Sequence, residues 1–153
     1  MDLALIVMLA SGAAALGGRG QLTVARLAGG LGPSLALLSA ALLTAALSAA
    51  AMALAGTWLA SQFIGYARLW LVCGGLVIAA LELAWPVRLP ELKEPTRSLG
   101  AIALVLLWRQ LFDAPRWIAF AGGAAVVSGL SAGLGAAIGS GAALLLGWMM
   151  PAS

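Results

Sequence analysis

Charged and amide side chains interrupt an apolar run in the second half of the chain. The run extends from 99 to 122 and contains Arg109, Gln110, Asp113 and Arg116. An ionisable residue at the centre of a bilayer costs about 2.5–3.5 kcal/mol on insertion scales, so such residues usually have a function. In a continuous helix, Arg109 at i−4 and Arg116 at i+3 share a face with Asp113. The stretch predicts either a structural ion-pair cluster or a polar site for a transported ion.

A second polar interruption lies in the first half of the chain. Residues 17–21, with the sequence Gly-Gly-Arg-Gly-Gln, fall inside an apolar run from 3 to 27. Glycines loosen a helix at this point, whereas Pro115 in the later stretch removes a backbone hydrogen bond to Leu111. A pair of hydrophobic segments interrupted by Gly or Pro, one in each half, indicates a transporter site near the bilayer midplane.

The composition determines the class of protein that positions these residues. The 153 residues are 63% hydrophobic and 8% charged, and the mean hydropathy is +1.09. Soluble domains are about 45–50% apolar and about 25% charged, so the chain is predicted to be an all-α integral membrane protein. With eight Lys plus Arg in total, no clustered basic face for nucleic acid is expected.

Catalytic residue types are scarce in this sequence. The chain has no His, and Cys73 is its only cysteine. These counts exclude an intrachain disulfide and the usual zinc sites, and any proton relay must use carboxylates. We therefore expect neither an enzyme nor a cofactor, and the lipid bilayer is the expected partner.

Hydrophobic stretches of about 20 residues predict five transmembrane helices. The charged, proline-rich segment 86–98 divides the chain into a first repeat (1–85) and a second repeat (99–153). Three spans precede this loop and two follow it, so the halves begin in opposite orientations, as in an inverted repeat. The five predicted spans are 3–27, 33–55, 64–85, 99–122 and 124–150.

Loop charges predict the orientation of these spans. Arg26, Arg88, Lys93 and Arg97 fall on one side of the membrane, and Arg68 falls on the other. The positive-inside rule places the 86–98 loop and the C-terminus in the cytoplasm and the N-terminus outside. We expect a multi-pass protein of the bacterial inner (plasma) membrane.

Two further features belong to the third and fifth spans. Glu82 lies one turn before Trp85, and we interpret it as an interfacial carboxylate that faces Arg88 or a neighbouring helix, with a transport role as the alternative. The span 124–150 contains two Gly-x-x-x-Gly pairs, 129/133 and 135/139. This spacing allows helix backbones to approach closely. It fits ordinary packing, and it also offers a surface for a homodimer or another membrane protein.

The first interruption resembles a known motif, E-x-G-D-[KR]-[TS]-Q. Gly17, Arg19 and Gln21 match it, whereas Ala15 stands in place of Glu and Gly18 in place of Asp. This motif occurs twice in the GDT family of calcium/manganese–proton exchangers, the transmembrane-protein-165 type.

The second interruption resembles the other copy of the motif. Asp113 matches the motif Asp, and Gln110 replaces the Glu. Phe112 replaces the Gly, and Ala114 and Pro115 replace the basic and hydroxyl residues. The resemblance covers most of the chain, although the family usually has six spans rather than five.

The resemblance implies a cation site lined by acidic residues from two helices, exchanging Ca or Mn for protons. Hard divalent cations take several oxygen ligands, and this chain offers Asp113 as the metal ligand, with Gln110 and Gln21 beside it. Three hypotheses stay open. The chain is a divergent cation exchanger, a transport-inactive assembly or regulatory subunit, or an anion carrier that binds its cargo through three arginines: Arg19, Arg109 and Arg116.

Overall fold

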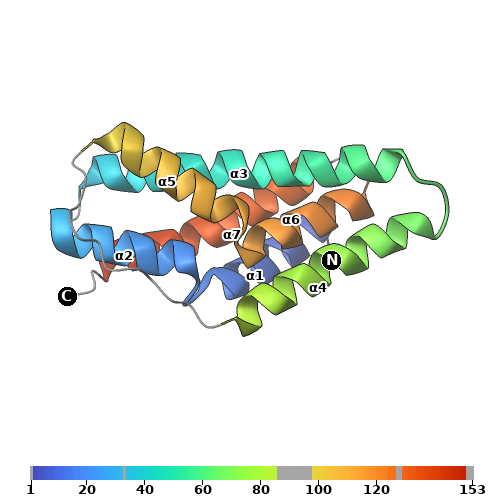
Figure 1. The fold of residues 1–153 in the computed structure, drawn as a ribbon, viewed down its shortest axis with the longest axis horizontal. Helices are drawn as coiled ribbons and strands as arrows, with labels where there is room; N and C mark the ends of the chain where they lie inside the picture. The colour runs from blue at the N-terminus through green and yellow to red at the C-terminus, as the bar shows by residue number, and fades with distance from the viewer. Residues whose placement is uncertain (1, 33, 86–97, 127–128, 151–153) are drawn as a thin grey trace.

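A computed structural model describes residues 2–32, 34–85, 98–126 and 129–150, and all regular structure in these ranges is helical. The helices run roughly along the long axis of the molecule (Figure 1). Trp148 Nε1 joins the end of the last helix to the start of the third by donating to the Ser34 carbonyl at 3.1 Å. The helices are α1 (Leu3–Ala15), α2 (Arg19–Leu31), α3 (Leu35–Ser61), α4 (Ala67–Ala84), α5 (Leu99–Leu111), α6 (Ala114–Ala125) and α7 (Gly129–Met149).

The first predicted span is a bent pair of helices. α1 and α2 meet at 55°, and Gly17 between them has φ +72°. That backbone region is costly for residues with a Cβ but open to glycine. The break therefore lies at the predicted glycines and directly precedes Arg19.

The span predicted over 99–122 is also divided, into α5 and α6. The predicted breaker, Pro115, lies directly after this break, and α5 ends at Leu111, the residue whose hydrogen bond Pro115 removes. The helix stops at Phe112–Asp113, before Pro115, which lies in the first turn of α6. Proline is tolerated there because a first-turn N–H has no intrahelical partner. The interruption is therefore a full break between two helices, and α6 begins at Ala114 with Pro115 in its first turn.

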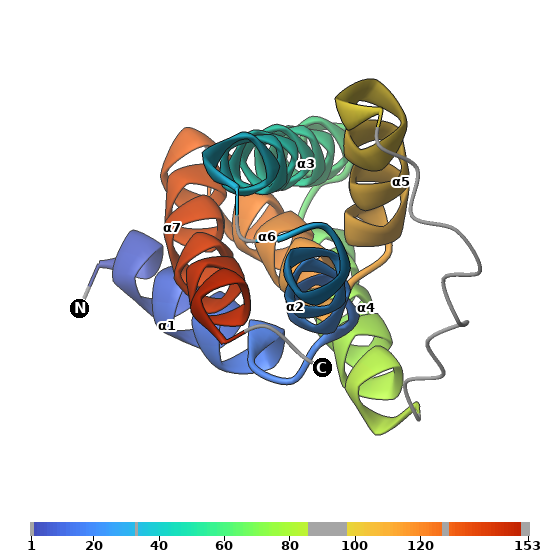
Figure 2. The ribbon, with the colours of Figure 1, turned by 90° about the vertical axis from the view of Figure 1, so that its left-hand side faces the viewer.

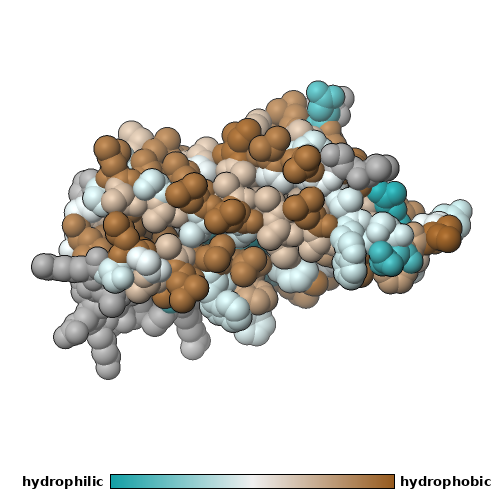
Figure 3. All heavy atoms as spheres, turned by 90° about the horizontal axis from the view of Figure 1, so that it is seen from above, coloured by the Kyte–Doolittle hydropathy of each residue, from teal (hydrophilic) through white to brown (hydrophobic). Residues whose placement is uncertain are grey.

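Within the described residues, three helices (α3, α4 and α7) are long and apolar enough to cross a membrane, and the bent α1–α2 pair would make a fourth span. Hydrophobic side chains cover most of the face seen in Figure 3, and the most hydrophilic ones lie toward the end that holds the α3–α4 connection. Such a surface fits a multi-pass membrane protein. α5 is apolar but has only 13 residues, so the five predicted spans stay a prediction.

Each broken pair packs along the long helix of the opposite half. α1 and α2 contact α7, whereas α5 and α6 contact α3, and α3 and α7 also pack together. Viewed along the long axis, α2 and α6 lie centrally, with α1 and α5 on the outside (Figure 2). α4 covers the outer side of α6.

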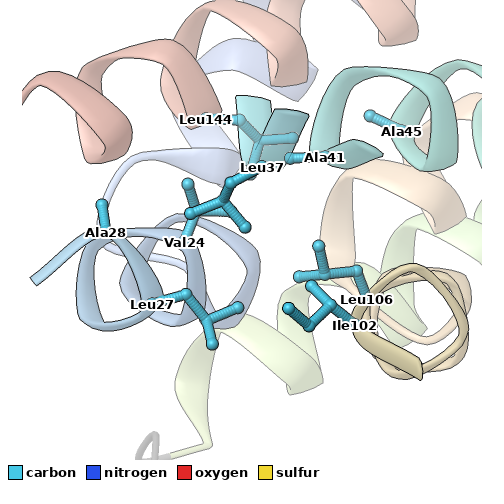
Figure 4. Close-up of a cluster of buried hydrophobic side chains, with 9 residues drawn as sticks. All are labelled: Val24, Leu27, Ala28, Leu37, Ala41, Ala45, Ile102, Leu106 and Leu144. Atoms are coloured by element: carbon cyan, nitrogen blue, oxygen red, sulfur yellow. The ribbon is translucent and has the colours of Figure 1, made fainter. Parts of the chain in front are cut away.

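Small residues permit this close packing. A Cβ at Gly135 or Gly139 would meet the α1 backbone carbonyl of Ala4 or Met8. Gly129 and Gly133 likewise face α3, so both predicted glycine pairs are used inside the molecule. A larger apolar cluster closes the other end, where side chains from α2, α3, α5 and α7 meet around Val24 and Leu106 (Figure 4).

Candidate functional site

The two helix breaks converge on one small, partly open cavity of about 20 Å³. That volume holds about one water molecule. The first residues of α2 and α6 lie beside it, so the positive ends of two helix dipoles meet here. Its polar lining comes from four parts of the chain: Gln21, Glu82, Gln110, Asp113, Arg116 and Ser140.

Asp113 connects the two broken pairs. It is the N-cap residue of α6, but its side chain makes no capping bond to its own helix. Instead the carboxylate accepts a hydrogen bond from the backbone N–H of Gly20, in the first turn of α2. A Cβ at Gly20 would lie 3.1 Å from Asp113 Oδ2, so the absence of a side chain at this position permits the approach.

Glu82 likewise accepts a hydrogen bond from the N-terminus of a half-helix, in this case α6. Its Oε2 accepts a hydrogen bond from the backbone N–H of Ala114, the first residue of α6, at 3.1 Å. Its Oε1 lies 3.1 Å from Arg19 Nε at the start of α2. Each half-helix N-terminus therefore faces a carboxylate, which offsets its partial positive charge.

This placement refines the interpretation of Glu82. It does face neighbouring helices, as one of the two predicted alternatives states, and Arg88 lies outside the described residues. It also lines the cavity beside Asp113, although the sequence-based site did not include it. Its sequence signal, a carboxylate close to an apparent helix end, is also the signal of an ordinary interfacial residue.

Arg116 is buried at the centre, with 2% of its surface exposed. Its Nε donates to Ser48 Oγ at 2.6 Å and its Nη1 to Ser140 Oγ at 2.9 Å. Its Nη2 lies 3.5 Å from Gln110 Oε1. Three neutral oxygens, from α3, α7 and α5, thus surround one guanidinium.

The predicted cluster of Arg109, Asp113 and Arg116 on one helix face is wrong. The break at Phe112 separates Arg109 from the other two, because helical spacing does not continue across it. Arg109 Nη1 lies instead 3.3 Å from Thr23 Oγ1 on α2, and Arg109 does not line the cavity. No ion pair joins Asp113 to either of these two arginines, all of which are described.

The remaining predicted residues lie at the break between α1 and α2 or line the cavity. The Gly17 N–H donates to Gln21 Oε1 at 2.6 Å, and Gly18 is the N-cap of α2. Pro115 also borders the cavity. Apart from Arg109, every predicted site residue therefore belongs to the cavity or to the two breaks beside it.

The amide nitrogen of Gln110, which lines the cavity, is a buried polar atom without a hydrogen-bond partner. Gln110 is 1% exposed, and its Nε2 makes no hydrogen bond. Buried amide nitrogens normally find an acceptor in the protein or in an ordered water. This donor therefore marks a place where a water or another oxygen-bearing group fits.

The ligand chemistry of the site is oxygen-based. Within the described ranges, no group of three or more His, Cys, Asp or Glu side chains could hold a metal ion. Two carboxylates, Asp113 and Glu82, are joined by the neutral oxygens of Gln21, Gln110 and Ser140. A cation bound here would therefore depend on amide and hydroxyl oxygens as well as carboxylates.

Sequence reasoning missed Ser48 and Ser140, which accept hydrogen bonds from Arg116, as well as Gly20, and it raised a transport role for Glu82 only as an alternative. The serines stand alone in small-residue helices, where Ser is also common as a packing residue.

Comparisons with protein-family models, with curated proteins and with solved structures find no match to this chain.

Proposed function

We propose that this chain is a GDT-like membrane transporter, a divergent cation/proton antiporter with Ca or Mn as its cargo. The observation that supports this most strongly is the meeting of two broken helix pairs at a small cavity lined by Asp113 and Glu82. Discontinuous helices that meet at the midplane are typical of secondary transporters. Buried carboxylates within membrane helices are typical of ion and proton pathways.

The packing supports an inverted repeat of three plus two spans. The order broken pair then long helix occurs twice, as α1–α2–α3 and as α5–α6–α7. Each broken pair lies along the long helix of the other half, as expected when one repeat is rotated onto the other. In this proposal α5 and α6 together make the fourth of five spans.

The donor set suits a hard cation that exchanges with protons. Asp113 and Glu82 can each hold a proton or a share of a cation, and Gln21, Gln110 and Ser140 offer neutral oxygens. Ca²⁺ prefers such oxygen ligands. Since the chain has no His, the carboxylates are the groups that would carry protons.

We propose the orientation that the loop charges predict, with the N-terminus outside and the C-terminus in the cytoplasm of a bacterial inner membrane. Reporter fusions at the two termini test it. A phosphatase active at the N-terminus and a fluorescent protein active at the C-terminus support five spans. Both termini on one side would contradict that number.

A second candidate function is an anion carrier. The N-termini of α2 and α6 lie beside the cavity, Arg116 lines it, and Arg19 is the first residue of α2. Helix N-termini bind anions readily because their N–H groups are free and the dipole favours negative charge. Here two carboxylates already occupy these N-termini, so the cation exchanger fits better.

Uptake into proteoliposomes tests the proposal. Vesicles with purified wild-type protein receive Ca²⁺, Mn²⁺ or a panel of small anions. Cation uptake that Asp113→Asn abolishes supports the exchanger, whereas anion uptake lost in Arg116→Gln supports the carrier. Flux of no ion, together with a stable membrane partner, supports a transport-inactive subunit.

A homodimer or a partner protein would meet α7 through a different face from the predicted one. The glycines of α7 pack inside the molecule. Leu130, Leu134 and Ile138 of the same helix are exposed and lie four residues apart, so they share one face. Cross-linking in native membranes through cysteines placed at these positions tests this arrangement.

A further inference from the structure

The environment of Arg116 resembles that of a bound cation rather than that of a structural ion pair. Buried arginines are normally paired with a carboxylate, since an unpaired buried charge is costly. Arg116 instead directs its nitrogens to Ser48, Ser140 and Gln110, all neutral oxygens. Asp113, three residues before it, interacts with it electrostatically but forms no direct ion pair with it.

The two serines are arranged to present oxygen lone pairs to this position. Ser48 Oγ donates to the Ala45 carbonyl at 3.1 Å, and Ser140 Oγ donates to the Ala136 carbonyl at 2.7 Å. Each hydroxyl hydrogen is therefore used, so each oxygen can only accept at the Arg116 side. The pair favours a positive group whether it is a guanidinium or a metal ion.

The cavity already contains a fixed positive group beside its two carboxylates. Asp113, Glu82 and Arg116 line it, and Arg19 pairs with Glu82 from outside the lining. The side chain of Arg19 is 39% exposed, whereas Arg116 is enclosed. A divalent cation entering this cavity would meet the fixed charge of Arg116 at close range.

We propose that the guanidinium of Arg116 is a tethered cation that occupies part of the oxygen-lined site and competes with the transported cation. Arg116 then sets the affinity of the site for the metal ion, because the ion binds only when the guanidinium leaves its hydrogen-bonded oxygens. This inference rests on the proposed cation exchange. It adds a residue that determines affinity and keeps the cargo-free cavity closed.

The unpartnered Nε2 of Gln110 agrees with this arrangement. Gln110 turns its oxygen to Arg116 and leaves its buried amide nitrogen without an acceptor. A cation that replaced the guanidinium would use the same oxygen. A water molecule bound to the incoming cation, or one of the lining carboxylates, would then accept a hydrogen bond from Gln110 Nε2.

Mn²⁺ binding to the purified full chain in detergent tests the proposal. Arg116→Gln removes the charge, Arg116→Lys keeps it, and Arg109→Gln removes a nearby arginine that does not line the cavity. We expect Arg116→Gln to bind Mn²⁺ at least about tenfold more tightly than wild type, which is about 1.4 kcal/mol. Arg116→Lys and Arg109→Gln should bind Mn²⁺ as wild type does.

Free guanidinium provides a second test, which also covers a neutral variant that folds poorly. In Arg116→Ala, millimolar guanidinium should enter the vacated position, raise the melting temperature and compete with Mn²⁺. The same guanidinium concentrations should change the melting temperature of the wild type little. Stabilisation of Arg116→Ala by neither guanidinium nor Mn²⁺ would overturn the proposal, as would Mn²⁺ binding to Arg116→Gln that is no tighter than to Arg116→Lys.

These results separate the inference from the proposed function. Wild-type flux that depends on Asp113, with no gain of affinity in Arg116→Gln, keeps the exchanger and rejects the tethered cation. No wild-type flux, with tight Mn²⁺ binding in Arg116→Gln, supports the tethered cation and rejects exchange by the natural chain.

Discussion

The carboxylate of Asp113, the N-cap of α6, accepts its backbone hydrogen bond from Gly20 in the first turn of α2. Residues 93 positions apart in the sequence thereby fix the two helix breaks against each other. Glu82 completes the arrangement by accepting from Ala114 and pairing with Arg19. The site is thus held by exchanged contacts between elements rather than by contacts within one helix.

Substitution of Gly20 tests this contact. In Gly20→Ala the added Cβ would lie 3.1 Å from Asp113 Oδ2, so the carboxylate must shift. We expect a loss of stability of about 1–3 kcal/mol, typical of overpacking, and weaker cation flux. Gly30→Ala is the matched control, since its Cβ meets nothing within 4 Å. Equal melting temperatures for the two variants would contradict the contact.

Glu82 should matter through both its charge and its hydrogen bond. Glu82→Gln keeps an acceptor for Ala114 but leaves Arg19 unpaired, whereas Glu82→Ala removes both. A buried donor without a partner costs about 1–3 kcal/mol. We expect thermal unfolding to rank the proteins wild type, Glu82→Gln, Glu82→Ala, from most to least stable. A Glu82→Ala protein as stable as wild type would show that α4 does not close the site.

The packing of α1 on α7 predicts a contrast between two glycines of α7. A Cβ at Gly139 would run into the Met8 carbonyl, whereas one at Gly141 only touches a Leu42 methyl at 3.4 Å. Gly139→Ala should therefore destabilise by about 1–3 kcal/mol, and Gly141→Ala should be close to neutral. Thermal melts in detergent measure both. The reverse ranking would place α1 on another face of α7.

Arg109 should be dispensable for transport. Its guanidinium lies beside Thr23 and outside the cavity lining, so Arg109→Gln should keep most of the wild-type flux. The same flux measurement on Arg116→Gln gives the comparison. Loss of flux in Arg109→Gln alone would return this residue to the site and favour the helix face that the sequence predicted.

The location of the site could be predicted from the sequence because polar residues within apolar runs are costly and rare. The breaks near Gly17 and Asp113 follow from that reasoning and from glycine and proline chemistry. The prediction that Arg109 and Asp113 share a helix face is wrong, because it assumed helical spacing through a segment that is not helical.

The partners of the site residues could not be predicted in the same way. Glu82, Ser48 and Ser140 join the site only through tertiary packing, which brings α4, α3 and α7 beside α6. Helical periodicity says which residues share a face, but it does not say which helix that face meets.

Proton release driven by Mn²⁺ tests the central claim most directly. Proteoliposomes that enclose a pH-sensitive dye receive external Mn²⁺, and the internal pH is followed for wild type and for Asp113→Asn. The cation/proton exchanger predicts that wild type exports protons and raises the internal pH, and that Asp113→Asn does not respond. An equal response from both proteins, or Mn²⁺ entry without proton movement, would contradict a carboxylate exchange site at Asp113.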